Sequence, residues 1–351
     1  MVIKMLEFIM LGGLPGSGKS TWTKDKTEYD VHSSDAIRAE LFGDEDVQEK
    51  PAEVFKLMFE RTVESLKAGR SVIYDATNLT RKNRVNTLTE IKRALKGIEV
   101  SYKYVLVYAP IKTCKLRNAA RERVVPNHVI DRMLKAFELP VKAEGWDDIS
   151  VYYSSPLYIN YRDAIKTYIG QEPHDNPHHV LDIDLHMYGA YDYFVRKFEH
   201  TTFPAFLTYA ILFHDLGKKF CKTYYNRKGE LCDKAHYYNH ANVGAYIALG
   251  LDFTGFVWDD AAIGWIEGFS EEDKYNMALL INFHMRPLEA WADSNKAKAK
   301  DKELLEPDLF WYLEIVNECD KNSEEDLEFL DQFKAYAEKY RTGEIVCFYS
   351  D

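Results

Sequence analysis

The chain has 351 residues, of which 46% are apolar and 29% are charged, with 18 Gly and 11 Pro. This composition is typical of a folded protein of two domains and excludes collagen-like, low-complexity and disordered chains. Because there is no apolar run of about 18 residues and no cleavage pattern near Met1, we expect neither a membrane span nor a signal peptide. The five cysteines lack CxxC spacing, which favours a reduced, cytoplasmic protein over a disulfide framework or a thiolate zinc site.

The net charge of −11 is unevenly distributed along the chain. Residues 1–150 hold 25 Lys and Arg against 22 Asp and Glu, whereas the remainder holds 20 against 34. A mildly basic first half and an acidic second half indicate two regions with different functions.

Short apolar runs alternate with amphipathic stretches in the first half. Residues 6–11, 71–74 and 102–108 have the pattern of strands, and residues 51–67 and 81–95 have helical periodicity. Strands that alternate with helices predict an α/β domain, with a parallel sheet covered by helices on both faces.

A glycine-rich motif follows the first predicted strand directly. Residues 13–20, Gly-Leu-Pro-Gly-Ser-Gly-Lys-Ser, fit G-x-x-x-x-G-K-[ST] and precede a predicted helix, which is the context of a phosphate-binding loop (P-loop). Backbone N–H groups of such a loop surround phosphate oxygens, while Lys19 contacts the β- and γ-phosphates and Ser20 offers its hydroxyl to Mg²⁺. We therefore predict that ATP or another NTP binds with Mg²⁺. The predicted binding residues are Gly13, Gly16, Ser17, Gly18, Lys19, Ser20 and Thr21.

A candidate for the acceptor side is the segment Ser34-Asp35-Ala-Ile-Arg38. At the end of a second strand, Asp35 would face the nucleotide and take the proton from an attacking hydroxyl, while Arg38 steadies a phosphate. An Asp that caps a helix, with a surface Arg, explains the same residues.

Three arginines further along, Arg117, Arg121 and Arg123, are predicted to share one helix. After the last strand of a P-loop core, such a cluster is placed to close over ATP and its transferring phosphoryl group. A solvated basic face is the alternative.

Four segments of the first half together resemble the phage polynucleotide 5′-kinase family: GLPGSGKS, SSDAIR, YDATNLTRKNR and RNAARERVVP. The resemblance covers roughly residues 5–152 and implies transfer of the ATP γ-phosphate onto a 5′-hydroxyl end. It implies that Asp35 is the general base, that Arg38 holds the acceptor-side phosphate, and that Arg121 is a lid residue on the transferred phosphate.

From about residue 176 the strand signal disappears, so we expect an all-α second domain. The predicted helices are residues 186–198, 203–213, 239–249, 274–283 and 308–317. The predicted organisation is a kinase domain at 1–155, a linker at 156–175 and a helical domain at 176–351.

Two His-Asp dipeptides occur in the second half. His174-Asp175 lies among Pro and Asn residues, where a loop explains it, whereas His214-Asp215 closes an apolar helical run. A buried carboxylate beside a buried imidazole is costly unless a metal accepts both.

Nitrogen and oxygen ligands suit one or two ions of Mn²⁺, Fe²⁺, Co²⁺, Ni²⁺ or Zn²⁺. Further candidate ligands are His186, His240, His284 and Asp320, although each His by itself is more often an ordinary core or surface residue.

This His and Asp pattern is similar to the HD phosphohydrolase superfamily, an all-helical, metal-dependent fold, over about residues 176–325. Residues 176–186 and 238–245 resemble the HD modules attached to tRNA CCA-adding enzymes. The resemblance implies that a metal-activated water attacks phosphorus and that Lys218 stabilises the developing charge. A Lys that complements a helix dipole also explains Lys218. The resemblance makes His186, His214, Asp215 and Asp320 the core ligands, and His240 and His284 additional ones.

Together, the two resemblances predict a bifunctional end-healing enzyme of nucleic-acid repair. It would phosphorylate 5′-OH ends of RNA or DNA and remove a 3′-phosphate or 2′,3′-cyclic phosphate, with a separate nucleic-acid ligase as a partner acting downstream. One alternative is a P-loop kinase for a nucleotide-sugar or metabolite fused to an HD nucleotidase. The other is a nucleotide-sensing regulatory protein whose HD site only binds.

Overall fold

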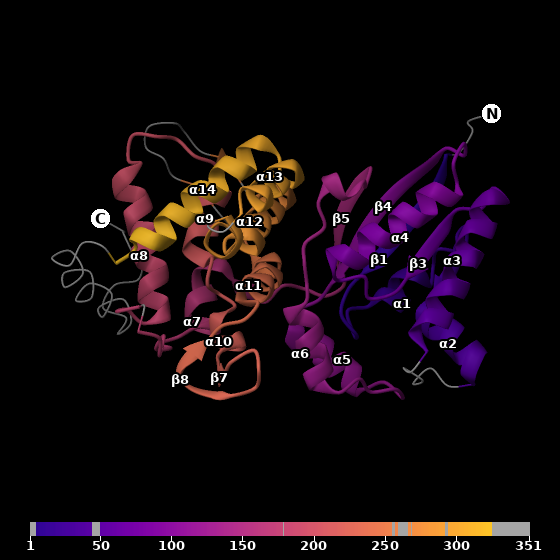
Figure 1. Ribbon diagram of the computed structural model, residues 1–351, viewed down its shortest axis with the longest axis horizontal. Coiled ribbons are helices and arrows are strands. Elements are labelled where there is room, and N and C mark those ends of the chain that lie inside the picture. Colours follow the sequence, from indigo (N-terminus) through magenta and orange to yellow (C-terminus); the bar gives the residue numbers. More distant parts are fainter. Residues whose placement is uncertain are drawn as a thin grey trace. The chain divides into compact units, whose positions relative to one another are not determined.

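The computed structural model describes residues 5–43, 50–177, 179–254, 257–258, 266–267, 269–291 and 294–324. The chain divides into two compact units, one that runs to Leu157 and takes in Glu303–Leu305, and one that begins at Tyr158 (Figure 1). Within the described ranges, every helix is too short or too polar to span a membrane.

A five-stranded sheet forms the centre of the first unit, and all its neighbouring strands are parallel. In spatial order it contains β2 (Asp30–Ser33), β3 (Val72–Asp75), β1 (Leu6–Gly12), β4 (Val100–Tyr108) and β5 (Asp148–Tyr153). The predicted parallel α/β architecture is confirmed. Sequence analysis did not find β5, because this edge strand begins with a charged residue and alternates exposed and half-buried positions.

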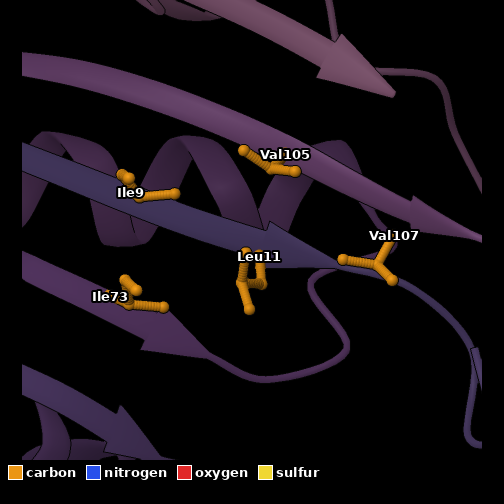
Figure 2. Close-up of a cluster of buried hydrophobic side chains, with 5 residues drawn as sticks. All are labelled: Ile9, Leu11, Ile73, Val105 and Val107. Carbon is orange, nitrogen blue, oxygen red and sulfur yellow. The ribbon is translucent and has the colours of Figure 1, made fainter. Parts of the chain in front are cut away.

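The core of the sheet consists of branched aliphatic side chains from its three central strands. β1 is apolar on both faces because it lies between β3 and β4 and is covered from both sides. Figure 2 shows one of these faces, on which Trp22 and Tyr29 also pack. Its buried side chains are Ile9, Leu11, Ile73, Val105 and Val107.

Helices connect the strands of the first unit. The helix predicted at residues 51–67 is observed with those bounds, and the one predicted at 81–95 ends one residue earlier. The helices are α1 (Lys19–Thr23), α2 (Ser34–Phe42), α3 (Pro51–Lys67), α4 (Arg81–Ala94), α5 (Ile111–Ala119) and α6 (Asn127–Lys135), with the 3₁₀ turn η1 (Lys142–Glu144).

Helices also dominate the second unit, and the five predicted ones correspond to α8, α9, α11, α12 and α14. Its helices are α7 (Ala164–Tyr168), α8 (Ile183–Lys197), α9 (Ala205–Phe213), α10 (Lys218–Cys221), α11 (His240–Leu249), α12 (Glu271–Phe283), α13 (Asn295–Leu304) and α14 (Pro307–Asn322), with the short turns η2 (Tyr161–Asp163) and η3 (Pro287–Trp291).

The all-α prediction for this unit is wrong in one respect, because three short two-stranded ribbons interrupt the helices. Strands of two to six residues are too short to show an alternation that can be recognised in sequence. The pairs are β6 (Ile159–Asn160) with β9 (Leu251–Asp252), β7 (Thr223–Tyr225) with β8 (Leu231–His236), and β10 (Val257–Trp258) with β11 (Ile266–Glu267).

Candidate functional site

The glycine-rich loop lies between β1 and α1, at the carboxyl end of the central strand. Gly16 and Gly18 have φ of 77° and 101°, and a Cβ on Gly16 would lie 2.2 Å from the carbonyl oxygen of Cys114. The loop therefore fits closely against α5 and tolerates no side chain there. Lys19 Nζ donates to the carbonyls of Gly13 at 2.8 Å and Leu14 at 3.1 Å, so the ammonium lies inside the loop.

Asp35 lies in the first turn of α2, directly after β2. The capping residue of α2 is Ser33, so the alternative explanation of Asp35 as the cap does not hold. One carboxylate oxygen, Oδ1, accepts from Arg38 at 2.9 Å and from Arg123 at 3.0 Å. The Asp35 side chain is still 43% exposed, so a hydroxyl group from solution can reach its carboxylate.

Asp75 is a site residue to which sequence analysis gave no role. It is the last residue of β3, level with Leu11 of β1 and Ser33 of β2, and it is buried. Burial raises the pKa of its carboxyl group, and the charge of Lys19 opposes that rise. The recognisable signal was a carboxylate at a strand end beside the loop, where ligands bind in open α/β sheets.

The prediction that the three arginines share one helix is wrong, because α5 ends at Ala119. The Asn118 amide donates to the carbonyl of Val125 at 2.8 Å and accepts from its N–H at 3.1 Å, which closes the intervening residues into a loop. This lid loop, residues 119–125, carries Arg121 and Arg123. Arg121 lies close enough to Lys19 to lower the pKa of its ammonium, although burial of Lys19 is the larger cause.

Arg117 braces the phosphate-binding loop. Its guanidinium donates to Ser154 Oγ at 2.8 Å and to the Ser154 carbonyl at 2.9 Å. Ser154 Oγ in turn donates to the carbonyl of Ser17 at 2.5 Å. The chain after β5 and the helix α5 are thereby joined to the loop that would hold the phosphates.

All six predicted metal ligands come together in the second unit, from five separate segments of chain. The four histidines and Asp215 are buried, with no side chain more than 7% exposed. They are His186 in α8, His214 and Asp215 after α9, His240 at the start of α11, His284 after α12, and Asp320 in α14.

The six ligands form two groups of three. In the first, His186 Nε2 lies 3.0 Å from Asp320 Oδ1 and 3.3 Å from His214 Nε2. The second consists of Asp215, His240 and His284.

In the second group, His240 Nε2 lies 3.1 Å from His284 Nε2 and 3.2 Å from Asp215 Oδ1. The other oxygen, Asp215 Oδ2, lies 3.2 Å from His214 Nε2 in the first group. Asp215 thus bridges the two groups.

The histidine rings are oriented by hydrogen bonds at their outer nitrogens. His214, His240 and His284 each place Nδ1 at 2.7–2.8 Å from the backbone carbonyl three residues earlier. A carbonyl only accepts, so Nδ1 carries the proton and Nε2 faces the cluster as a donor of its lone pair. Nitrogen and carboxylate donors that converge in this way fit one or two divalent transition-metal ions.

The electrostatics of the cluster favour a cation at its centre. Burial by itself would lower the pKa of His214, but the carboxylates of Asp215 and Asp320 raise it to about 10. The two carboxylates therefore stabilise positive charge beside this ring. Burial lowers the pKa of His284 to about 3, and the charges of His240 and His214 add to this, so its ring stays neutral.

Two glycines allow the helices around the cluster to approach closely. A Cβ on Gly217 would lie 2.1 Å from the carbonyl oxygen of His240, and one on Gly189 would lie 2.6 Å from that of Ser323. Larger residues would push α11 away from Asp215, and the end of α14 away from His186. Neither glycine was singled out in the sequence: Gly189 lies inside α8, and Gly217 lies in the turn between α9 and α10.

Lys218 lies beside the cluster, with Nζ 2.6 Å from Asp215 Oδ2 and 3.0 Å from His174 Nε2. It is the first residue of α10, a helix of four residues whose last turn also includes it. His174, which sequence analysis assigned to a loop, is buried, and its Nδ1 lies 2.6 Å from the carbonyl of Leu181. Burial and the charge of Lys218 lower the pKa of His174 to about 2, which keeps its Nε2 an acceptor.

Comparison with known proteins finds similarity in the first unit. Residues 8–140 match the family described as an AAA domain. An L-seryl-tRNA(Sec) kinase of Methanococcus maripaludis is 26% identical over 166 residues, which are 45% of this chain and 62% of the relative. The chain thus spans less than two thirds of that relative's length.

Solved structures to which the chain is similar include the following two. A chain of the Pnkp1/Rnl/Hen1 RNA repair complex is 25% identical, with a TM-score of 0.30 over 37% of this chain and 43% of that one. A gluconokinase from Sinorhizobium meliloti is 16% identical, with a TM-score of 0.30 over 43% of this chain and 84% of that one. With its parallel sheet, its glycine-rich loop and this family match, the first unit is a P-loop kinase domain.

Proposed function

We propose that the protein heals nucleic-acid ends, with a 5′-hydroxyl kinase in the first unit and an HD-type phosphohydrolase in the second. The observation that carries the proposal is the double cluster bridged by Asp215, because a kinase by itself has no use for six converging candidate metal ligands, five of them buried. Cleaved ends that bear a 5′-hydroxyl and a 3′-phosphate or 2′,3′-cyclic phosphate need both activities before a ligase can join them.

In the kinase step, the 5′-hydroxyl oxygen forms a bond to the γ-phosphorus of ATP as the bond to the β–γ bridging oxygen breaks. Asp35 accepts the hydroxyl proton, and Arg38, which donates to Asp35, would hold the acceptor-side phosphate. Lys19 would exchange its loop carbonyls for phosphate oxygens, and Arg121 on the lid loop would meet the charge on the transferred group. Ser20 and Asp75 would hold Mg²⁺ directly or through water.

The remaining P-loop residues would hold the phosphates of ATP through their backbone, and Arg117 and Arg123 would flank the nucleotide. These backbone donors are Gly13, Gly16, Ser17, Gly18 and Thr21.

In the hydrolytic step, water adds to the terminal phosphorus, the bond to a ribose oxygen breaks, and that oxygen receives a proton. His186, His214, Asp215, His240, His284 and Asp320 would hold one or two transition-metal ions. Bound ions would supply Lewis-acid activation of the water and of the phosphoryl oxygens. Lys218 would donate a hydrogen bond to a phosphoryl oxygen while His174 holds its ammonium in place.

A second candidate is a small-molecule kinase fused to an HD nucleotidase, which the modest net charge of +3 in residues 1–150 favours. The name of the L-seryl-tRNA(Sec) kinase supports an acceptor hydroxyl carried by RNA instead.

The test is a gel assay of an oligonucleotide with a 5′-hydroxyl and a 3′-phosphate, incubated with ATP and a panel of divalent metals. Both ends are followed separately, and gluconate and free nucleosides serve as competing acceptors. Phosphate gain at the 5′ end and loss at the 3′ end support the proposal. Phosphorylation of the small acceptors alone, with both oligonucleotide ends unchanged, would refute it.

A further inference from the structure

The β7–β8 hairpin is inserted between two of the candidate metal ligands. The chain leaves the cluster at Asp215 and returns to it at His240, and the hairpin is the main element between them (Figure 1). At its tip, the backbone N–H groups of Lys228 and Glu230 donate to the Asn226 side chain at 2.9 and 3.0 Å. Its base is therefore at the cluster, and its tip is a well-formed turn.

The base of the hairpin is fixed by hydrogen bonds to the segment that carries His174. The Tyr224 hydroxyl donates to Asp175 at 2.6 Å, and Lys222 donates to the carbonyl of Pro173 at 2.7 Å. Tyr237, directly after β8, donates to the carbonyl of His174, and its ring lies 5.5 Å from Lys218 Nζ. A ligand held by the hairpin would thus be held at a fixed position relative to the cluster.

The charge of the hairpin is opposite to that of the rest of its half of the chain. The hairpin, residues 223–236, contains three Lys and Arg against two acidic residues, whereas residues 151–351 carry a net charge of −14. Arg227, Lys228 and Lys234 are exposed. Exposed basic side chains attract a polyanion, whereas the net negative charge of the rest of this half of the chain disfavours one.

Exposed flat and apolar side chains accompany these charges. Tyr225 and Leu231 face each other across the two strands and are 55% and 73% exposed. Behind the tip, Arg227 lies 5.1 Å over the ring of Tyr238, which stacks on His236 with centroids 5.2 Å apart. An exposed aromatic residue among basic ones is the combination that binds single-stranded bases, which stack while their phosphates are neutralised.

We propose that the β7–β8 hairpin is a binding arm for single-stranded nucleic acid that leads a 3′ end to the metal cluster. The inference rests on the proposed function in one point, namely that the cluster acts on a 3′ end. Binding by the arm itself requires no catalysis.

The experiment measures fluorescence anisotropy of single strands of about 12 nucleotides, within the usual site size of single-strand-binding modules. RNA and DNA strands are compared, each with a 5′ label that blocks the kinase site and a 3′-hydroxyl that cannot be hydrolysed. We expect Tyr225→Ala to weaken binding about 5- to 100-fold through loss of one stacked base. The double substitution Arg227→Glu with Lys228→Glu should make the negative slope of log affinity against log salt concentration less steep by about 1.4.

The matched control is Lys296→Glu with Lys300→Glu, the same charge change on exposed positions of α13, and it should bind as wild type does. Equal affinity of the wild-type and hairpin variants, or preference for poly-glutamate over the oligonucleotides, would overturn the inference. The proposed function is tested separately by phosphate release from a 3′ end. If it fails, wild-type protein releases no phosphate but still binds single strands through the arm. Hydrolysis of a 2′,3′-cyclic mononucleotide, which is too short to reach the arm, should be equal in wild-type and hairpin variants.

Discussion

The phosphate-binding loop and the metal cluster differ in how the chain assembles them. The loop uses one continuous stretch, residues 13–21, whereas the six candidate metal ligands come from five segments between His186 and Asp320. Backbone N–H groups at a strand–helix turn suffice to bind a phosphate. A metal cluster needs side chains that helix packing holds at fixed positions.

The two sites also differ in exposure. Asp35 at the kinase site is 43% exposed and is reached by an arginine of the lid loop, whereas His214 and Asp215 are only 1% exposed. We therefore expect substitutions at the kinase site to act on single steps of the reaction, and substitutions at the cluster to act on the whole centre.

The largest effect should follow Asp215→Ala, which removes the bridge between the two groups. Release of a 3′-phosphate or 2′,3′-cyclic phosphate should fall by about 10³-fold or more, since both metal positions lose a ligand. Phosphorylation of a 5′-hydroxyl should be unchanged, because Lys19 and Asp35 lie in the other unit. Asp163→Ala, at an exposed carboxylate of the same unit, is the control. Equal loss of both activities would show that the sites are not independent.

Asp35→Ala should lower the rate of 5′ phosphorylation by about 10²- to 10⁴-fold, since the proton acceptor is lost. ATP affinity should stay within a few-fold of wild type, because the loop is intact. Steady-state kinetics and ATP titration measure the two quantities. Asp30→Ala removes a carboxylate of β2, the strand that precedes Asp35; Asp30 accepts from Arg70 at 2.6 Å, and its loss should leave the rate unaltered. A normal rate in the Asp35 variant would remove this residue from the mechanism.

Arg121→Ala should lower kcat by roughly 10²-fold, the usual cost of one donor to developing charge. The KM for ATP should change less, because charge on the transferring group grows toward the transition state. A change in KM alone would make the lid loop a binding surface instead.

His174→Phe should lower phosphohydrolase kcat by about 10-fold, the lower end of what outer-shell partners contribute. The ring shape is kept, but Lys218 loses the acceptor that holds its ammonium at 3.0 Å. His174→Gln supplies an acceptor again and should recover part of kcat. If both variants behave alike, His174 has a packing role only.

Gly217→Ala should have the smallest effect on chemistry and should act through packing. Its Cβ would overlap the His240 carbonyl, which should lower the free energy of unfolding by about 1–3 kcal/mol. Gly244→Ala, where the nearest atom would be 3.2 Å away, should cost less. Thermal unfolding of the two variants measures the difference, and equal melting temperatures would contradict the close packing of α10 and α11.

The sequence predicted what local pattern determines. The helix at Pro51–Lys67 was predicted with its observed bounds because it begins at a proline, has regular apolar spacing, and ends before a glycine. The strand that precedes the P-loop was found because apolar residues run continuously up to Gly12.

Features that depend on contacts between distant segments were missed or only listed as candidates. The lid loop exists because Asn118 bonds the backbone of Val125, and no periodicity signals such a contact. His174 becomes part of the cluster only because Lys218, 44 residues later, lies against it. The six ligands could be named from residue type and resemblance, but their division into two bridged groups follows from helix packing.

The most direct test of the account is the metal content of the purified full chain, measured by plasma mass spectrometry after loading with Mn²⁺ or Zn²⁺ and removal of excess metal. Purified wild-type protein should retain one or two ions per chain, and Asp215→Ala should retain fewer than one. Wild-type protein that retains no ion, or an Asp215→Ala variant that retains two, would contradict the account.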